Sequence, residues 1–230
     1  PSGGLYIVDM YRGLVQHRIY LTSYLRAQAE SRGLEKDIDK GRIYRVVYKG
    51  ASKSLQNLAK ASGKQLVVAL SSENGWTRDT AQRLLVESSE DVNADLAKLA
   101  TYGDNALGRV HALWTLEGRA AISPAVVLDA LSDSDRGVRM AAARLAEPWL
   151  KLPGSDAIID QLVLNTGADD ITELRQMVLS LGAHGNILTH MGIRSALYNH
   201  ADKPYIMDAA LSGLAGEELE FLELLLAERR

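Results

Sequence analysis

A small or β-branched residue recurs about every thirty residues through most of this chain, and that period constrains the fold more than any other feature. Successive recurrences are 31, 30, 36 and 32 residues apart, at Ala81, Ala112, Ala142, Val178 and Ala210. A period near thirty with two helices per unit is typical of helical-hairpin repeats, because one hairpin buries its apolar face only when a neighbour stacks on it. The sequence therefore predicts a mainly α fold, an α-solenoid of about five helical hairpins over residues 51–230.

The small residue and the Leu positions three and four later suit the close packing of a HEAT-like repeat. Acidic residues also stand where helices are expected to begin, since Asp104 and Asp135 precede two of the repeat helices. The last segment, 217–230, has its acids early and its two arginines at the end. This order favours a helix and predicts a terminal cap on the repeats.

Residues 1–50 differ in composition from the rest of the chain and form the first of two predicted domains. Residues 4–10 and 42–48 are rich in β-branched and aromatic side chains, which predicts two strands. Between them, Thr22 or Ser23 is expected to begin a helix and Gly33 to end it. A lone strand pair is marginal in water, so this small β element is expected to belong to a larger sheet or to lean on the helices that follow.

Composition excludes several kinds of chemistry within these residues. Cysteine is absent, which rules out disulfides, thiolate metal sites and covalent attachment of c-type haem. No apolar run is long enough for a membrane span. Residues 51–230 carry seventeen Lys and Arg against twenty-four Asp and Glu, so a nucleic-acid partner is not expected. The chain starts Pro1-Ser2-Gly3-Gly4, without a methionine or signal peptide, which is what we expect of a piece excised from a longer protein.

The first fifty residues also contain specific motifs. They read Gly4-Leu-Tyr-Ile-Val-Asp-Met-Tyr-Arg-Gly13, Gln16-His-Arg18, Tyr24-Leu-Arg26, Arg32-Gly-Leu-Glu35 and Gly41-Arg-Ile-Tyr-Arg45. These motifs resemble the end of the β-propeller in the glucose/sorbosone-dehydrogenase-like family (membrane-bound dehydrogenase, PVC-type haem-binding). Residues 74–85 are similar to that family's first HEAT helix, with Thr77 added between Trp76 and Arg78.

The resemblance implies that residues 1–50 are the C-terminal blade remnant of a β-propeller that runs into HEAT repeats. It implies a parent oxidoreductase that is extracytoplasmic, either periplasmic or secreted. Such a parent would hold PQQ or a sugar in the propeller and a c-type haem in a cytochrome domain further along. Neither cofactor can be assembled from these residues alone, so the expected partners are the propeller and cytochrome domains or another protein.

Three side chains just after the first predicted strand are candidates for catalysis. Asp9, Arg12 and His17, with Arg18 beside them, offer an acid, a base and groups that bind anions. In a functional interpretation, His17 is a base or a ligand to a quinone carbonyl and Arg12 stabilises developing negative charge. In the structural interpretation, which we favour, a salt bridge anchors a turn and His17 bonds to the backbone.

Four arginines share one position of the repeat and are candidates for an interaction ladder: Arg78, Arg109, Arg139 and Arg175. They form either a salt-bridge spine with acids of neighbouring repeats or a stripe that binds an anionic partner. We favour the spine because the repeat region is acidic overall. Trp76, Trp114 and Trp149 are expected to fill gaps between helices. The spacing of His184, His190 and His200 does not suit a metal site.

These observations leave three functions open. The first is a non-catalytic connector that sets the distance between a catalytic propeller and an electron acceptor. The second is a free-standing HEAT-repeat binding protein whose β element is only a cap. The third is an enzyme built on the same repeats, such as a HEAT-type lyase or DNA glycosylase. The acidic charge disfavours the glycosylase, and a lyase would need a tetrapyrrole cleft. The absence of a complete catalytic set supports the binding protein.

Overall fold

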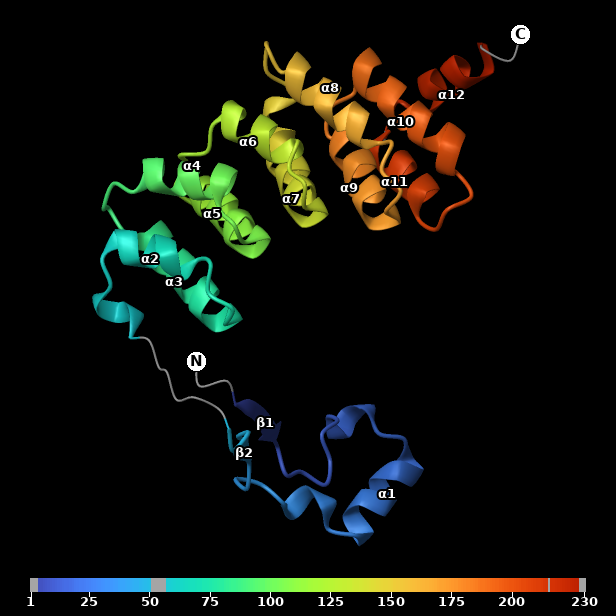
Figure 1. Cartoon of the computed structure of the whole chain (residues 1–230). Coiled ribbons are helices and arrows are strands. Elements are labelled where there is room, and N and C mark those ends of the chain that lie inside the picture. Colours follow the sequence, from blue (N-terminus) through green and yellow to red (C-terminus); the bar gives the residue numbers. More distant parts are fainter. Residues whose placement is uncertain (1–3, 51–56, 215, 228–230) are drawn as a thin grey trace. The chain divides into compact units, whose positions relative to one another are not determined.

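The chain divides into two compact units, residues 1–56 and 57–230, close to the boundary predicted at residue 50. The computed structural model describes residues 4–50, 57–214 and 216–227. Among these, the first unit contains two strands and one α-helix, and the second is helical (Figure 1). The prediction of a mainly α fold with a small β element is therefore confirmed.

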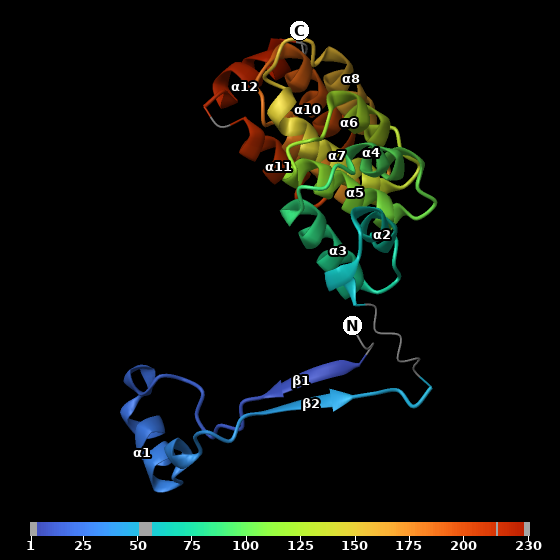
Figure 2. The ribbon, with the colours of Figure 1, turned by 90° about the vertical axis from the view of Figure 1, so that its left-hand side faces the viewer.

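The two strands of the first unit are β1 (Leu5–Asp9) and β2 (Arg42–Val46). They pair antiparallel, with Leu5 opposite Val46 and Asp9 opposite Arg42, and lie side by side in Figure 2. Both strands fall within the predicted ranges. Four of the five residues of β1 and all five of β2 are exposed, Val8 by 72% and Ile43 by 70%. The strand pair therefore leaves apolar side chains uncovered on both of its faces.

The segment that joins the strands carries the short helices η1 (Arg18–Tyr20) and η2 (Leu34–Lys36) on either side of α1 (Ser23–Ser31). Thr22 caps the N-terminus of α1, since its hydroxyl oxygen accepts a hydrogen bond from the Leu25 amide at 3.4 Å. Gly33 follows the helix with φ of 63°, a left-handed conformation that costs glycine little. Both predicted helix signals are confirmed.

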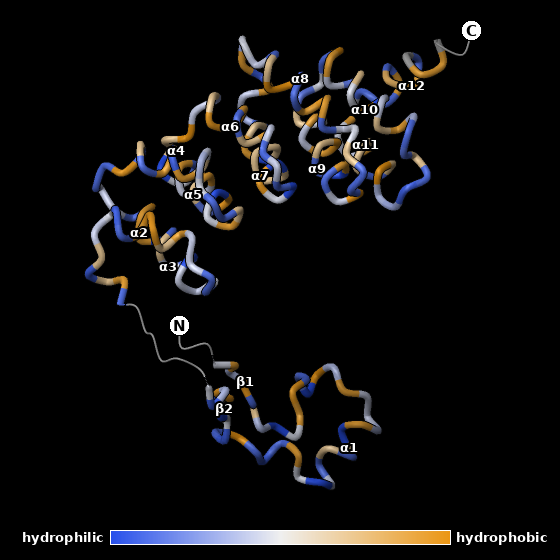
Figure 3. The backbone as a smooth tube through the Cα atoms, viewed as in Figure 1, coloured by the Kyte–Doolittle hydropathy of each residue, from blue (hydrophilic) through white to orange (hydrophobic). Residues whose placement is uncertain are grey.

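The second unit is built from five consecutive helix pairs and a last helix, with apolar residues recurring in every pair (Figure 3). A short helix, η3 (Leu58–Lys60), comes first. The pairs are α2 (Gly63–Ala69) with α3 (Gly75–Glu87), α4 (Asn93–Tyr102) with α5 (Ala106–Gly118), α6 (Pro124–Leu131) with α7 (Arg136–Ala146), α8 (Asp156–Asn165) with α9 (Ile171–Leu181), and α10 (Ile187–His200) with α11 (Ile206–Gly213). Helix η4 (Glu147–Trp149) extends α7, and α12 (Glu218–Ala227) is last.

Neighbouring helix pairs contact each other in the order of the sequence. Each odd-numbered helix from α3 to α9 contacts the next odd-numbered helix, and each even-numbered helix from α2 to α8 contacts the next even-numbered one. The recurring small residues lie inside these contacts, because Ala81, Ala112, Ala142, Val178 and Ala210 are all fully buried. Their predicted place in the core is confirmed.

Polar side chains begin the second helix of the first four pairs. Asn74, Asn105, Asp135 and Asp170 each accept a hydrogen bond from a backbone amide in the first turn. Asp135 has the role predicted for it. Asp104 does not, because the neighbouring Asn105 accepts the bond from the Leu107 amide at 2.8 Å.

Further contacts tie the pairs together. The Arg119 guanidinium, after α5, donates to the Asn93 side chain and the Glu90 carbonyl at 2.8 Å, to the Ser88 carbonyl at 2.9 Å and to the Leu85 carbonyl. At the other end of the unit, α9 and α11 meet through glycine. A Cβ added to Gly182 would lie 2.3 Å from the Gly213 Cα, so only glycine permits this approach.

The tryptophans differ in burial. Trp114 and Trp149 are partly buried and pack against the core, as predicted. Trp76 does not fill a gap, since it is 47% exposed. It lies in the first turn of α3, where the next residue, Thr77, takes the buried position instead. Among the described residues, no helix has both the length and the apolar content that crossing a membrane requires.

Candidate functional site

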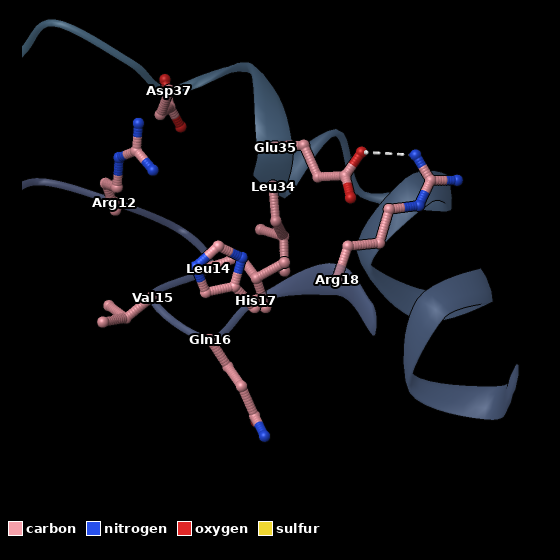
Figure 4. Close-up of a pocket in the computed structure, with 9 residues that line it drawn as sticks. All are labelled: Arg12, Leu14, Val15, Gln16, His17, Arg18, Leu34, Glu35 and Asp37. Carbon is pink, nitrogen blue, oxygen red and sulfur yellow. Dashed lines mark ion pairs between the residues drawn. The ribbon is translucent and has the colours of Figure 1, made fainter. Parts of the chain in front are cut away.

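The first unit contains a pocket of about 290 Å³ between two segments of the loop that joins the strands (Figure 4). One segment follows β1 and the other includes η2. Gly13 lets them meet, because a Cβ at this position would lie 2.9 Å from the Leu34 carbonyl oxygen. The lining residues are Arg12, Leu14, Val15, Gln16, His17, Arg18, Leu34, Glu35 and Asp37.

The two acids of the pocket both have cationic partners. Glu35 lies 3.5 Å from a guanidinium nitrogen of Arg18, which also pairs with Glu30. Asp37 lies 2.5 Å from the ammonium of Lys40. This hydrogen bond raises the pKa of Lys40, and the negative charge of Asp37 acts in the same direction. The acids are therefore compensated by groups other than Arg12.

Arg12 and His17 both line the pocket. Arg12 is exposed and forms no ion pair or side-chain hydrogen bond with any residue that the structure describes. His17 lies just before η1, where its carbonyl oxygen accepts from the Tyr20 amide at 3.0 Å. Its ring meets the edge of the Tyr20 ring at 6.4 Å between centroids.

Asp9 lies outside this pocket and is engaged elsewhere. Its carboxylate accepts from the Tyr11 amide at 2.9 Å and from the Arg42 guanidinium at 3.0 Å. The cause is the strand register, which places Arg42 directly opposite Asp9. The structure therefore brings together two of the three predicted catalytic residues. Asp9 forms its ion pair at the strand end with Arg42 and not with Arg12.

Sequence reasoning missed the second wall of the pocket. This wall consists of Leu34, Glu35 and Asp37, which follow Gly33. The sequence predicts only the end of a helix at Gly33. The alternation of acids and lysines from Glu35 to Lys40 is a weak signal that this turn faces charged groups. Its position against Arg12 depends on the loop returning to the strands, which local patterns do not specify.

In the second unit, three of the four predicted ladder arginines occupy equivalent positions. Each of Arg78, Arg109 and Arg139 stands four residues after the N-cap residue of its helix, the polar residue just before the helix's first residue. Each donates from Nη1 to the carbonyl oxygen six residues earlier, at 2.7, 2.6 and 2.7 Å respectively. They thereby fix the turn between the two helices of their own pair.

Two of these arginines also reach the next pair. Arg109 Nε and Nη2 donate to the two carboxylate oxygens of Asp133 at 2.7 and 2.8 Å. Arg139 Nε and Nη2 donate to those of Glu173 at 2.5 and 2.7 Å. This bonding raises the pKa of Arg139, chiefly through the hydrogen bond to Glu173. Arg78 forms no ion pair with any described residue. In the next pair, the position equivalent to Asp133, the partner of Arg109, is occupied by Gly103, which has no carboxylate.

Arg175 differs from the other three. It is exposed and forms no ion pair with any described residue. Asp170 is the N-cap residue of α9, so the position four residues after the cap is occupied by Leu174, which is buried. Arg175 is thus displaced by one residue from the ladder, and Glu173 of the same turn serves as the partner of Arg139. The bonded guanidiniums form links between helix pairs, the arrangement expected of a spine.

Two histidines of the second unit have polar partners. His111 Nδ1 lies 2.7 Å from the Gln82 side-chain oxygen. Burial lowers the pKa of His111, and the positive charge of Arg78 adds to this while Asp79 opposes it. His190 Nε2 on α10 lies 2.8 Å from Glu217. Within the described part of the chain, no three His, Cys, Asp or Glu side chains are grouped as a metal site would require.

Comparison with known proteins gives a match for the first unit. Residues 1–50 match a family model described as a domain of unknown function, DUF7133. A search of curated proteins found no match. A search of solved structures also found none. The matched residues are those of the strand pair and of the pocket that contains Arg12 and His17.

Proposed function

We propose that this chain is a junction in which a strand pair belonging to a larger β-sheet domain continues into a HEAT-repeat scaffold. In this proposal the scaffold is a non-catalytic connector that holds other domains or proteins at a set distance. The observation that carries the proposal is the exposure of the strand pair, in which nine of ten residues are open to solvent.

The strand pair needs a partner for two physical reasons. Its apolar side chains, including Leu5 at 63% exposed and Val46 at 53%, gain free energy only when another surface covers them. Each strand also pairs on one edge only within the described residues, which leaves the other edge open to a further strand. Both needs are met when the pair is part of a blade in a β-propeller.

The helical unit suits a scaffold. Its helix pairs contact mainly their neighbours along the sequence, and one continuous core runs from Leu58 to Phe221. This pattern supports an α-solenoid of the HEAT type, in which stability is shared between adjacent repeats and the long surfaces bind partners.

The resemblance described above supplies the proposed parent, an extracytoplasmic PQQ/sorbosone-dehydrogenase-like oxidoreductase. PQQ or a sugar would then lie in the propeller and c-type haem in a separate cytochrome domain. The chain itself would contribute spacing and contact surfaces rather than a cofactor site. The propeller and cytochrome domains of the parent, or another protein, would be its partners.

The test is to sequence the gene on both sides of these codons and then study the longer product. Upstream propeller blades with a signal peptide, and a downstream Cys-x-x-Cys-His motif, are expected. In the longer protein, amide hydrogen exchange in β1 and β2 should be slower than in residues 1–230 alone, because new strand pairing protects their outer edges. A start codon and a stop codon immediately flanking the chain, or unchanged exchange in the longer protein, contradicts the proposal.

A free-standing HEAT-repeat binding protein is the second candidate. The continuous core favours it, since every residue of that core lies within the second unit, between Leu58 and Phe221. The same sequencing experiment separates the two functions. Within the described ranges, no contact specifically favours a HEAT-type lyase.

A further inference from the structure

The pocket of the first unit has one guanidinium without an ion pair or hydrogen bond to any described residue. Asp37 is paired with Lys40, and Glu35 with Arg18. Asp9, in the adjoining hollow, is paired with Arg42. After these pairings Arg12 is the lining cation with no partner among the described residues. An arginine fork with five N–H donors and no internal acceptor is suited to an anionic ligand.

The walls of the pocket indicate what else the ligand contains. Leu14, Val15 and Leu34 line it together with the polar groups. A volume of about 290 Å³ lies just below the range of about 300–1,000 Å³ in which proteins bind small molecules. The pocket therefore has space for a short apolar body beside the anionic group.

The charge balance decides between kinds of anion. Glu35 and Asp37 remain at the same pocket, each beside a cationic partner, and Arg18 is shared between Glu35 and Glu30. Because these carboxylates repel any anion beside Arg12, a single negative charge is favoured over a dianion such as phosphate, which they repel about twice as strongly. The planar guanidinium also matches the two oxygens of a carboxylate through parallel hydrogen bonds.

We propose that this pocket binds a small organic monocarboxylate, held at its carboxylate by Arg12 and covered along its apolar body by Leu14, Val15 and Leu34. In the view of Figure 4 the His17 ring lies between Arg12 and Arg18, where a ring N–H can donate to the same ligand, and the Gln16 amide is directed away. The carboxylate comes from a free acid or from the end of a peptide. This site is independent of the connector function proposed above.

The experiment is an amide chemical-shift titration of isotopically labelled residues 1–230 in a low-salt buffer, with acetate, butyrate and inorganic phosphate as separate probes. Butyrate is expected to shift amides of residues 12–18 and 33–37. It should bind about three- to tenfold more tightly than acetate, because it buries two more methylene groups in part. A short peptide with a free C-terminus, compared with its amidated form, tests the peptide source of the carboxylate.

Two variants of equal charge test the role of Arg12. Arg12→Gln is expected to weaken butyrate binding about tenfold or more, because a charge-assisted bond is lost. Arg32→Gln is the matched control, since Arg32 is exposed in the same unit and does not line the pocket. Arg12→Lys should lose most of the affinity while keeping the charge.

Three results would overturn the proposal. They are equal losses in Arg12→Gln and Arg32→Gln, full affinity in Arg12→Lys, and phosphate shifting the same amides as strongly as butyrate. Because Arg12 has no ion pair or hydrogen bond with a described residue, its replacement breaks no such interaction, and unshifted amides in residues 57–230 would show that the second unit is intact.

Discussion

The ion pair between Arg139 and Glu173 gives the sharpest test of how the helix pairs are linked. The Glu173 side chain is 3% exposed and accepts both of its hydrogen bonds from Arg139, whose own side chain is 22% exposed. Arg139→Met removes both donors and leaves a buried carboxylate uncompensated. Three residues earlier on α7, Arg136 pairs with Asp170 but is 62% exposed, so Arg136→Met is the matched control.

The expected magnitudes differ severalfold. Breaking a buried pair by removing one partner costs about 3–5 kcal/mol, and the partial exposure of Arg139 places this case near the lower end. For a unit of this size, about 3 kcal/mol lowers the melting temperature by about 6–12 °C. Breaking the exposed pair of Arg136 costs less than about 1 kcal/mol.

Urea unfolding and thermal melts followed by far-UV circular dichroism measure both variants. The double variant Arg139→Met/Glu173→Met removes the buried charge as well. It should therefore be more stable than Arg139→Met alone, by at least about 1 kcal/mol. Equal losses in Arg139→Met and Arg136→Met, or a double variant no more stable than Arg139→Met, would refute the view that a desolvated carboxylate dominates this link.

Three other changes test separate parts of the second unit. Because burial lowers the pKa of His111, protonation favours the unfolded chain, so stability is complete above the ordinary value of 6.5 and falls as pH drops below it. His111→Gln should flatten that dependence in urea unfolding measured from pH 7.5 to 5. Arg119→Ala should lower the free energy of unfolding by about 2–3 kcal/mol, because four hydrogen bonds from one guanidinium are lost; a loss under about 0.5 kcal/mol would contradict this. Gly182→Ala should cost about 1–3 kcal/mol by forcing α9 from α11, whereas Gly75→Ala, whose Cβ would be 3.6 Å from its nearest neighbour, should not destabilise, with both read from melting temperatures.

How far the sequence predicts the structure depends on how local each signal is. Thr22, Gly33 and the buried alanines from Ala81 onward act through their own turn or helix, so their roles follow from the pattern. The pairing of Asp9 with Arg42 depends on strand register, which a local spacing of acid and arginine does not contain. Local pattern therefore located β1 and β2 but chose the wrong partner for the acid.

The arginine ladder shows the same limit within a repeat. Arg78, Arg109 and Arg139 are equivalent because three successive helices begin at the same distance before them. The next helix begins after Asp170, which shifts Arg175 by one residue, and one residue turns a side chain by about 100° around a helix. A shift of one residue hardly changes the period of the small residues. The same shift turns an arginine side chain away from the carboxylate that it would have to pair with.

The glycine contact between α9 and α11 has a mechanical consequence. The pairs that precede it are joined by long arginine side chains, which can follow their partners as the helices separate. The contact at Gly182 and Gly213 has no such reach, because a gap of about 0.5–1 Å already removes a quarter to a half of the dispersion attraction. Under a pulling force, this glycine contact would lose its attraction at a smaller displacement than the arginine links between the preceding pairs.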